Sequence, residues 1–591
     1  MTGVQTCALP IYGYYSRFTS DVRRRGIRIE GLGGIAAQDV SNAVVANGAI
    51  VGGRIQSGSG LTATLVNQDE SDKNELYTIG GNIAKDIGAV TISGDIAYSR
   101  ANSFFNNSGI NVDAYGAGGT RLSATRGALV VDYKLNGLDR PDVKFNHDFT
   151  DPATNLFQGF YIVPEDNRDQ LKSFAGDLKW NIDGDFLKSL EFGGRYAKRD
   201  ATRIVTSFNS FGIASPVQVP AQFRTVAGFE GRFADAGLPN FLSVDIDGVL
   251  DQFVGPNRVA DQTFGFTRDQ SFTLKEDTLA GYGQLNFGGT LGAVPVRGNL
   301  GLRVVSTEQS STSSTNGVFV TVGDKFTNWL PSFNGVIELT DQDFIRVSAS
   351  RQLSRAAFFD IRSTVQITYD GAGVPGGSGG NPFLRPFLAN QFDLGYEHYF
   401  GSTGIFSAGA FYKDLKTFVI NGTTPGFNFR TNGFGVLLDN APPPASGAPK
   451  QDVGPFSQPV NGQGGYVWGL EFNYTQAFTD LPAPFDGLGV ILNYAYTESD
   501  LDITSSTSGQ PTSLTLPGLS KHVANPTIYY EKAGFGARLG VRYRSKYVAP
   551  QVGAVSNPAV NAAETVMDAQ LSYEFQDSSR SPLNWLPSWN S

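Results

Sequence analysis

The feature that most constrains the fold is a two-residue period of apolar side chains. In residues 391–400 every second position is apolar or aromatic: Phe392, Leu394, Tyr396, His398 and Phe400. The positions between them are mostly polar: Gln391, Asp393, Gly395, Glu397 and Tyr399. Because successive side chains of a strand point to opposite faces, this pattern predicts a β-strand with one apolar and one polar face.

The same period recurs almost to the end of the chain, and five further clear examples are 190–196, 299–304, 470–475, 535–544 and 568–575. About fifteen strands are expected from such segments. A few more are expected in 11–66 and 128–165. The fold class is therefore all-β.

The connections between these strands alternate between short and long. The short ones are 85–88, 183–188, 340–343, 401–404 and 532–534. The long ones, rich in Gly, Pro, Ser and Asn, are roughly 207–270, 355–388, 421–463 and 501–519. Short turns on one rim and long loops on the other are typical of a transmembrane antiparallel β-barrel, with the short turns in the periplasm. A whole barrel must close, because an open sheet edge in lipid leaves backbone groups unpaired, but an incomplete or forced closure is expected of these 591 residues.

Composition supports a barrel over the other classes. Charged residues make up 17% of the chain and aromatic residues 12%, and the net charge is −9. No apolar run reaches the roughly 20 residues of a membrane-spanning helix. The acidic balance gives no basic patch for nucleic acid, and so many aromatics argue against disorder. A soluble β-sandwich is expected to carry more charge on its outward faces.

The barrel hypothesis predicts the direction of individual side chains. Six residues should face lipid: Phe392, Leu394, Tyr396, Leu539, Val541 and Leu571. Four should face the lumen: Asp393, Glu397, Arg538 and Arg542. Aromatic residues nearest the short turns should form an interfacial girdle.

Six segments carry a family resemblance: 328–355 (NWLPSFNGVIELTDQDFIRVSASRQLSR), 380–400, 404–419, 464–482, 516–548 and 567–575. They resemble the barrel of a TonB-dependent outer-membrane receptor, of the large type common in Caulobacter, sphingomonads and xanthomonads. Residues 12 to 270 match this pattern more loosely. The resemblance implies a fragment of a barrel of about 22 strands.

The resemblance also implies a function and partners. Such a receptor imports a scarce, bulky extracellular ligand, a ferric siderophore or an oligosaccharide, across the outer membrane of a Gram-negative bacterium. The protein is expected to be a monomer in outer-membrane lipid. Its energy would come from the TonB complex, which grips a box in front of an N-terminal plug domain.

Neither the plug nor the box is visible, and both ends of the chain are unusual. Residues 4–11 (VQTCALPI) resemble a translated sequencing adapter, so 1–11, with Cys7, are expected to be an artefact. Residues 12–575 are expected to be the barrel domain without its plug. The alternation stops after Phe575, and family members end on an aromatic residue, so 576–591 are expected to be a truncated or frameshifted tail.

No catalytic, cofactor-binding or metal constellation emerges, so no enzyme is predicted and no cofactor is expected. His147, His398 and His522 are far apart in sequence and are interpreted as incidental. Asp245, Asp247 and Asp251 lack the full ligand series of a calcium loop, so a solvated loop is preferred. Two further segments are interpreted as a mobile Gly-rich loop and a stiff Pro-rich loop, namely 371–382 and 440–450. Three arginines share one strand face and should line the lumen: Arg538, Arg542 and Arg544.

Two other functions stay open. A passive porin would share the lipid-facing pattern but would have no plug and would fold an acidic loop into its pore. A non-transport surface β-protein is the other alternative. Ligand-binding residues are unknown; the loop aromatics that could stack on sugars or catecholates, or pack loop against loop, are Phe104, Phe105, Phe208 and Phe211.

Overall fold

A computed structural model gives the fold of most of the chain. It describes residues 10–31, 35–46, 49–58, 61–116, 118–137, 140–182, 184–206, 208–210, 215–229, 238–253, 255, 270–315, 318–401, 403–444, 446–504, 511–549 and 560–575. Cys7 and the tail 576–591 therefore lie outside the described residues.

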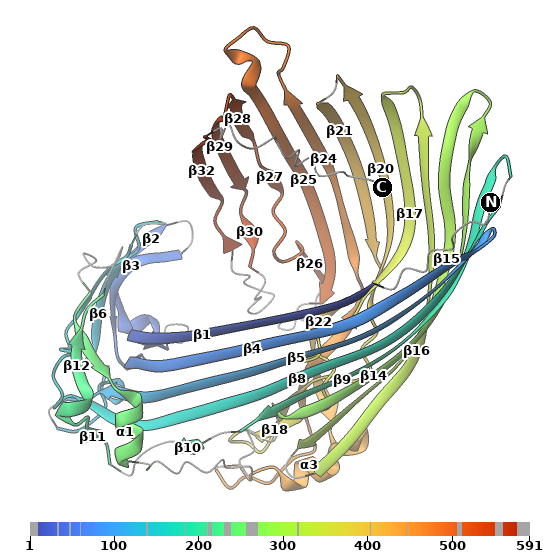
Figure 1. Ribbon diagram of the computed structural model, residues 1–591. Coiled ribbons are helices and arrows are strands. Elements are labelled where there is room, and N and C mark those ends of the chain that lie inside the picture. Colours follow the sequence, from blue (N-terminus) through green and yellow to red (C-terminus); the bar gives the residue numbers. More distant parts are fainter. Residues whose placement is uncertain are drawn as a thin grey trace.

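One 20-stranded sheet, antiparallel throughout, forms a curved wall (Figure 1). Its main strands, in spatial order, are β1 (Ile11–Glu30), β4 (Thr62–Ile87), β5 (Val90–Ala114), β8 (Asn155–Asn181), β9 (Leu187–Val205), β14 (Phe272–Leu291), β15 (Val294–Thr315), β16 (Val318–Glu338), β17 (Asp343–Ser354), β20 (Phe387–Phe400), β21 (Gly404–Leu415), β24 (Gly465–Ala477), β25 (Leu488–Thr504), β28 (Thr527–Lys532), β29 (Phe535–Arg544) and β32 (Glu564–Tyr573). The short strands β10 (Phe208–Ser210) and β11 (Val217–Gln218) pair with β8, and β26 (Pro511–Leu514) and β27 (His522–Ala524) pair with β25.

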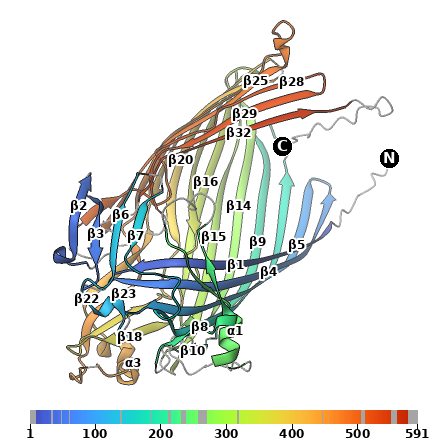
Figure 2. The same cartoon turned by 90° about the vertical axis from the view of Figure 1, so that its left-hand side faces the viewer.

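The wall is open within the described residues. The first strand, β1, pairs with β4, and the last, β32, pairs with β29. Figures 1 and 2 show these two edge strands apart from each other. Within the described residues the closure is thus incomplete, as expected of a barrel fragment. Pairing begins one residue earlier than expected, since Ile11 already faces Gly81.

The two rims differ as predicted. Hairpin ends such as Ile87↔Val90, Phe400↔Gly404 and Lys532↔Phe535 lie on one rim, because neighbouring strands of the wall run antiparallel. The long connections 355–386 and 416–464 leave from the opposite rim. In Figure 1 the short turns of β20, β21 and β25 are at the top, and α3 and β18, which belong to the long connections, are at the bottom. We call these the short-turn rim and the long-loop rim.

The wall has one apolar and one polar face. Val347, Leu394, Ala410 and Leu470 occupy one register row across four strands. The neighbouring positions face the other way, where Ser348 donates a hydrogen bond to Asp393 (2.8 Å). Hollows in the sheet are lined mainly by this polar face, which is therefore the concave, inner face.

The predicted side-chain directions are confirmed. Phe392 and Leu394 are 56% and 55% exposed on the outer face. By register the same face carries Tyr396, Leu539, Val541 and Leu571. The inner face carries Asp393, Glu397, Arg538 and Arg542. The period read from the sequence therefore gives the correct face on these strands.

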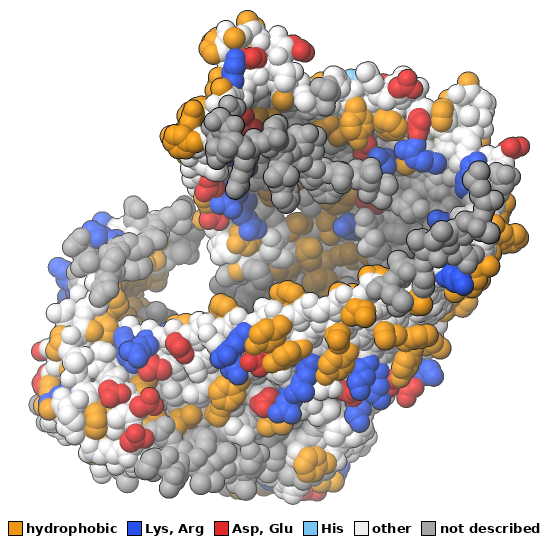
Figure 3. Space-filling model, viewed as in Figure 1, with side chains coloured by type: hydrophobic (Ala, Val, Ile, Leu, Met, Phe, Trp, Pro, Cys, Tyr) orange, Lys and Arg blue, Asp and Glu red, His pale blue; other side chains and the backbone are white. Residues whose placement is uncertain are grey.

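On β1, β4, β5, β8 and β9 the apolar outer face ends at an aromatic residue, and the next outward position is charged. The pairs are Tyr15 and Arg17, Tyr77 and Glu75, Tyr98 and Arg100, Phe174 and Lys172, and Tyr196 and Lys198. From Tyr77 to Ile87 the strand rises about 33 Å, or about 25 Å along the normal at a tilt of about 40°. We call this stretch the apolar band, and Figure 3 shows apolar side chains on the outward surface of these strands.

A first loop unit lies at the long-loop rim. It contains the sheet of β2 (Val40–Ala46), β3 (Ala49–Gln56), β6 (Val130–Lys134) and β7 (Asp142–Phe145), the hairpin of β12 (Arg224–Ala227) and β13 (Phe241–Val244), and helix α1 (Ile246–Phe253). Short 3-10 turns η2 (Ala37–Asp39), η3 (Leu122–Ala124) and η4 (Ala221–Phe223) belong to the same loops. Its core joins loop residues such as Leu129, Phe149 and Phe241 to wall residues Leu65 and Val112.

A second loop unit combines two connections that are far apart in sequence. Its sheet contains β18 (Val365–Tyr369), β19 (Pro375–Gly379), β23 (Val453–Gly462) and β22 (Phe418–Asn428), with η6 (Arg430–Phe434) and α3 (Gly435–Asn440) beside it. Phe427, Phe429, Phe434 and Phe456 pack together in its core. Within the Gly-rich segment 371–382, expected to be a mobile loop, Pro375–Gly379 form strand β19. For these five residues the expectation was wrong, because β18 and β23 pair with them.

Residues 355–364, which we call the inner strap, run along the inner face of the wall. The backbone N–H of Ser363 donates to Ser311 Oγ of β15 (2.8 Å), and Arg355 Nε lies 3.0 Å from Glu276 Oε2 of β14. Ile361 is buried with Ala201, Phe272 and Leu274. The connection after β17 therefore begins by folding inward.

Outside these units, β30 (Tyr547–Val548) pairs with β31 (Val560–Asn561), and the turn η7 (Phe485–Gly487) precedes β25. In the part of the chain that the structure describes, no helix is long and apolar enough to cross a membrane.

Candidate functional site

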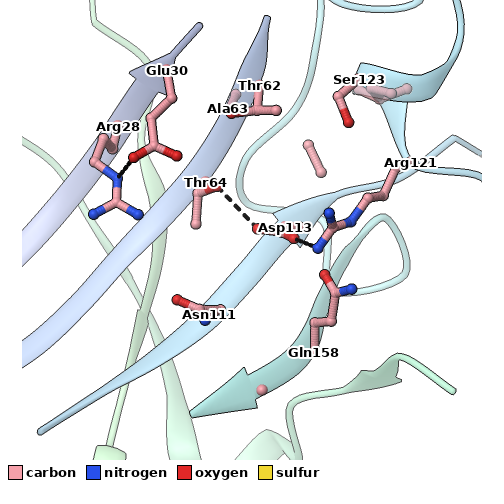
Figure 4. Close-up of a pocket in the computed structure, with 13 residues that line it drawn as sticks. Arg28, Glu30, Thr62, Ala63, Thr64, Asn111, Asp113, Arg121, Ser123 and Gln158 are labelled. Carbon is pink, nitrogen blue, oxygen red and sulfur yellow. Dashed lines mark hydrogen bonds and ion pairs between the residues drawn. The ribbon is translucent and has the colours of Figure 1, made fainter. Parts of the chain in front are cut away.

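A polar cavity of about 450 Å³ opens where β1, β4, β5 and β8 reach the long-loop rim (Figure 4). Its polar lining residues are Arg28, Glu30, Thr62, Thr64, Asn111, Asp113, Arg121, Ser123 and Gln158. Ala63, Ala114, Leu122 and Gly159 complete the lining, so none of the described lining residues is aromatic. We call this space the rim cavity.

The strand register builds the floor of the rim cavity. Arg28 of β1 faces Thr64 of β4, and Thr64 faces Asp113 of β5. Counted along the strands, these positions belong to the inner, polar face of the wall. Arg121 and Ser123 reach the cavity from the loop after β5, as Figure 4 shows. The cavity therefore lies on the same face as the lumen wall.

Charges in the rim cavity are balanced. Thr64 Oγ1 donates to Asp113 Oδ1 (3.0 Å), and Arg121 forms an ion pair with the same carboxylate. Arg28 Nε lies 3.0 Å from Glu30 Oε1. Two guanidinium groups thus face two carboxylates, which favours an uncharged polar ligand over a highly charged one.

Two buried polar atoms of the rim cavity have no hydrogen-bond partner among the described residues. They are Arg121 Nε and Gln158 Oε1. Burying such an atom unpaired costs about 1–3 kcal/mol. One is a donor and the other an acceptor, the combination that a hydroxyl group can satisfy.

Further hollows lie along the inner wall. One of about 850 Å³ is lined by Arg538, Arg542, Asn525, Asp568 and Gln570, among others. Arg542 Nη2 lies 3.1 Å from Asp568 Oδ2. The prediction that Arg538 and Arg542 line the lumen is therefore confirmed.

The third arginine of that group serves a different purpose. Arg544 Nη2 donates to the carbonyl of Gly518 (3.0 Å), and its Nε donates to Ser520 Oγ (3.1 Å). The guanidinium also lies over the Tyr547 ring at 3.7 Å. Arg544 thus fixes the connection before β27.

The three histidines lie on separate elements. His147 Nε2 is 3.1 Å from Asn155 Oδ1, and its ring meets Phe149 edge to face. Burial lowers the pKa of His147. His398 lies near the short-turn rim with Nδ1 2.8 Å from Asp343 Oδ1, and His522 Nδ1 is 2.9 Å from the Tyr494 hydroxyl.

The acidic group at 245–251 is not the solvated loop expected from the sequence. Asp245 precedes helix α1, and its carboxylate accepts from the backbone N–H of Gly248 (3.3 Å). The spacing of Ile246, Val249 and Leu250, all buried, is the helical signal that was missed. Within the described ranges, no three His, Cys, Asp or Glu residues are placed to hold a metal ion.

Two of the four aromatic residues expected in loops, Phe104 and Phe105, lie in strand β5, so that expectation was wrong for them. Phe104 is exposed on the outer face opposite Lys73, and Phe105 lies opposite Asp72 on the inner face. Phe211 and the side chain of Phe208 lie outside the described residues. The rim cavity itself was not predicted, because its residues come from four separate strands and a loop.

Comparison with known proteins gives one family match. The family described as TonB dependent receptor-like, beta-barrel matches residues 97–585. No curated protein matches the chain.

Several solved structures resemble the chain at low sequence identity. The unliganded ferric citrate transporter FecA is 10% identical, with a TM-score of 0.46, over 89% of this chain and 68% of that chain. The siderophore receptor PiuA from Acinetobacter baumannii is 11% identical, with a TM-score of 0.45, over 89% and 75%. The ferric-catecholate import receptor Fiu from E. coli K12 is 13% identical, with a TM-score of 0.45, over 97% and 75%.

Proposed function

Because this chain belongs to the TonB-dependent receptor β-barrel family, we propose that it forms the wall of a receptor for TonB-energised uptake of a bulky extracellular ligand. The long-loop rim then faces the outside of the cell and the short-turn rim faces the periplasm. The protein resides in outer-membrane lipid as a monomer and is no enzyme.

The rim cavity is the observation that carries this proposal. It opens on the inner face of the wall at the long-loop rim, where an incoming ligand first meets the barrel. Its balanced ion pairs and its two unpartnered polar atoms suit hydroxyl groups. An oligosaccharide is therefore the ligand class that we favour, and a ferric siderophore is the alternative.

We also propose a division of the chain. Residues 12–575 are the barrel domain, preceded in the parent gene by a plug and a TonB box, whereas 1–11 are an adapter artefact and 576–591 a damaged tail. Sequencing the genomic locus tests this division. A reading frame that replaces 1–11 with plug sequence supports it, and a locus that encodes 1–11 as they stand overturns it.

Uptake by the protein encoded at that locus tests the function. Cells that express it should accumulate labelled oligosaccharide, and accumulation should stop when TonB is deleted or the proton gradient is collapsed. Parallel assays with labelled ferric siderophores distinguish the two ligand classes. If the cells accumulate siderophore but no oligosaccharide, the proposed ligand class is wrong, whereas the proposal of a TonB-energised receptor still holds.

The inner strap favours a second candidate, a passive pore. A connection folded along the inner wall narrows an open channel, as in a porin, although this strap carries Arg355, Asp360 and Arg362 and is not the acidic loop expected of a porin. The same cells test this alternative, because a passive pore carries solute regardless of TonB or the proton gradient. Uptake that ignores both treatments therefore overturns the energised receptor in favour of the pore.

A further inference from the structure

A cavity of about 140 Å³ lies between the inner strap and the second loop unit. Its lining residues are Gln270, Phe359, Arg362, Thr364, Gln366 and Ser378. Three of them come from the strap, two come from β18 and β19, and Gln270 precedes β14. At about 30 Å³ for each water molecule, the cavity has room for about four waters or for one small polar group. We call it the strap cavity.

The strand register turns polar side chains of the second loop unit towards the strap cavity. Gln366 of β18 and Ser378 of β19 are register partners, and Thr364 lies two residues before Gln366 on the same face. The positions between them, Val365 and Ile367, are buried in the aromatic core of the unit. Because side chains of a strand alternate, one face of this hairpin packs in the core and the other lines the cavity.

Of the described lining residues, only Arg362 is charged. Its guanidinium is half-buried, lies over the Phe359 ring at 3.6 Å and donates to the Phe359 carbonyl. Asp360 attracts this guanidinium, but it does not line the cavity, and the two groups form no ion pair. Within the described ranges, Arg362 pairs with no other carboxylate. Burial lowers the pKa of Arg362 to about 10 and raises the pKa of Asp360.

A second guanidinium near the strap cavity, that of Arg203 on β9, already has its partner. Its Nη2 atom lies 2.7 Å from Glu165 Oε1 and donates to Gln270 Oε1 (3.3 Å). The amide carbonyl of Gln270 is therefore occupied, which leaves its NH₂ group as a donor. Glu165 balances Arg203, so the cation that lacks a contacting anion is Arg362.

This arrangement of groups suits a carboxylate. A guanidinium offers two parallel N–H groups that match the two oxygens of a carboxylate, and such charged hydrogen bonds are among the strongest in proteins. The amide of Gln270 and the hydroxyls of Thr364 and Ser378 supply neutral donors for the remaining lone pairs. No carboxylate of the described residues lines the strap cavity, whereas Glu30 and Asp113 line the rim cavity. One unpaired cation matches one negative charge.

We propose that the strap cavity binds a carboxylate group of the imported ligand, so that the oligosaccharide is an acidic one that carries uronic acid residues. The inference rests on the proposed uptake function and narrows its substrate class. Arg362 forms the ion pair with the carboxylate, and sugar hydroxyls occupy the rim cavity. Gln158 of the rim cavity and Glu165, the partner of Arg203, lie on the same strand β8, about 23 Å apart at about 3.3 Å per residue. An extended chain of several sugar rings spans that distance.

Two matched probes test the strap cavity. One is a trisaccharide of uronic acid, and the other is the same trisaccharide with its carboxyl groups reduced to hydroxymethyl groups. Isothermal titration of the full-length receptor should show about tenfold or more tighter binding of the acidic probe, because only that probe gains a charged hydrogen bond. Arg362→Gln should bind the two probes equally and should keep the wild-type affinity for the neutral one.

A second variant serves as the matched control. Arg385→Gln removes the same charge from the same connection, but Arg385 pairs with Asp324 (2.9 Å) and does not line the strap cavity. It should retain the preference for the acidic probe. Loss of that preference in Arg385→Gln would overturn the assignment to the strap cavity. Loss of affinity for the neutral probe in Arg362→Gln would overturn it as well, because the effect would then not come from the carboxylate.

Ferric citrate is the third probe, because an iron chelate can also supply a carboxylate. Binding of ferric citrate alone, with a loss in Arg362→Gln, supports the carboxylate subsite but overturns the acidic sugar and the proposed oligosaccharide class. Equal wild-type affinities for the two trisaccharides overturn the carboxylate subsite, whereas the oligosaccharide receptor of the proposed function still holds. If none of the three probes binds, the carboxylate subsite is wrong.

Discussion

The guanidinium of Arg199 lies over the ring of Phe358, with its central carbon 3.9 Å from the ring centroid. Arg199 belongs to β9 of the wall, and Phe358 belongs to the inner strap. Next to it, Arg203 of β9 lies over the ring of Phe359 of the strap, 5.3 Å from the ring centroid. Cation–π contacts of this kind contribute about 0.5–2 kcal/mol each, so they help to hold the strap against the inner wall.

We expect Phe358→Ala to loosen the inner strap. The variant loses the contact with Arg199, which leaves that guanidinium, among the described residues, paired with Asp169. Hydrogen–deuterium exchange of residues 355–364 should rise several-fold. Phe383→Ala is the matched control, because Phe383 follows in the same connection but is exposed, and it should leave the exchange unchanged. Equal exchange in both variants would show that the Arg199 contact does not hold the strap.

Ligand affinity should depend on the rim cavity. Gln158→Ala removes the unpartnered acceptor, and we expect about tenfold weaker binding of the proposed oligosaccharide ligand, the equivalent of one buried hydrogen bond of about 1.4 kcal/mol. Isothermal titration of the full-length receptor measures it. Gln170→Ala, on the outer face of the same strand, should bind normally. If Gln158→Ala bound the ligand with wild-type affinity, the rim cavity would not be part of the ligand-binding site.

The two faces of the wall should respond differently to the same charge. Leu394→Arg places a guanidinium on the apolar outer face, which the proposed receptor turns to lipid, and should lower the free energy of unfolding by about 2–4 kcal/mol, the cost of an arginine near a bilayer midplane. Ser407→Arg, on the inner face of the next strand, should change it far less. Urea titrations in phosphatidylcholine vesicles measure both. If Ser407→Arg lowered the free energy of unfolding more than Leu394→Arg does, the inner and outer faces would have to be exchanged.

The first loop unit should lose stability in mild acid. Burial against Phe149 holds the pKa of His147 below its usual value near 6.5. Above that pH the imidazole is neutral in both the folded and the unfolded loop, so it does not change the free energy of unfolding. As the pH falls below about 6.5, the unfolded loop takes up a proton first, so unfolding becomes easier until the folded-state pKa is passed.

Hydrogen exchange of residues 128–149 at pH 7.5 and pH 5.5 checks this expectation. Exchange, corrected for its intrinsic pH dependence, should be faster at the lower pH in the wild type. His147→Asn should abolish that difference, because the titrating group is gone. A pH dependence that survives this substitution would assign the effect to another group.

The sequence by itself determined most long strands of the wall, their faces and the two rims. The period at 391–400 placed Leu394 outside and Asp393 inside, and the turn at 401–404 lies on the short-turn rim as predicted. These properties are local. A strand turns each successive side chain to the opposite face wherever its partners are, so a few neighbouring residues suffice to read it.

Only the tertiary structure decided where the connections lie and which residues meet. Residues 375–379 form a strand because β18 and β23 lie beside them, and the strap at 355–364 folds inward because β9, β14 and β15 offer it apolar and polar partners. The rim cavity brings Arg28 to Asp113 through the register of three strands. Such contacts join residues that are far apart in the sequence. The sequence around each of these residues carries no periodic pattern that would reveal its partner.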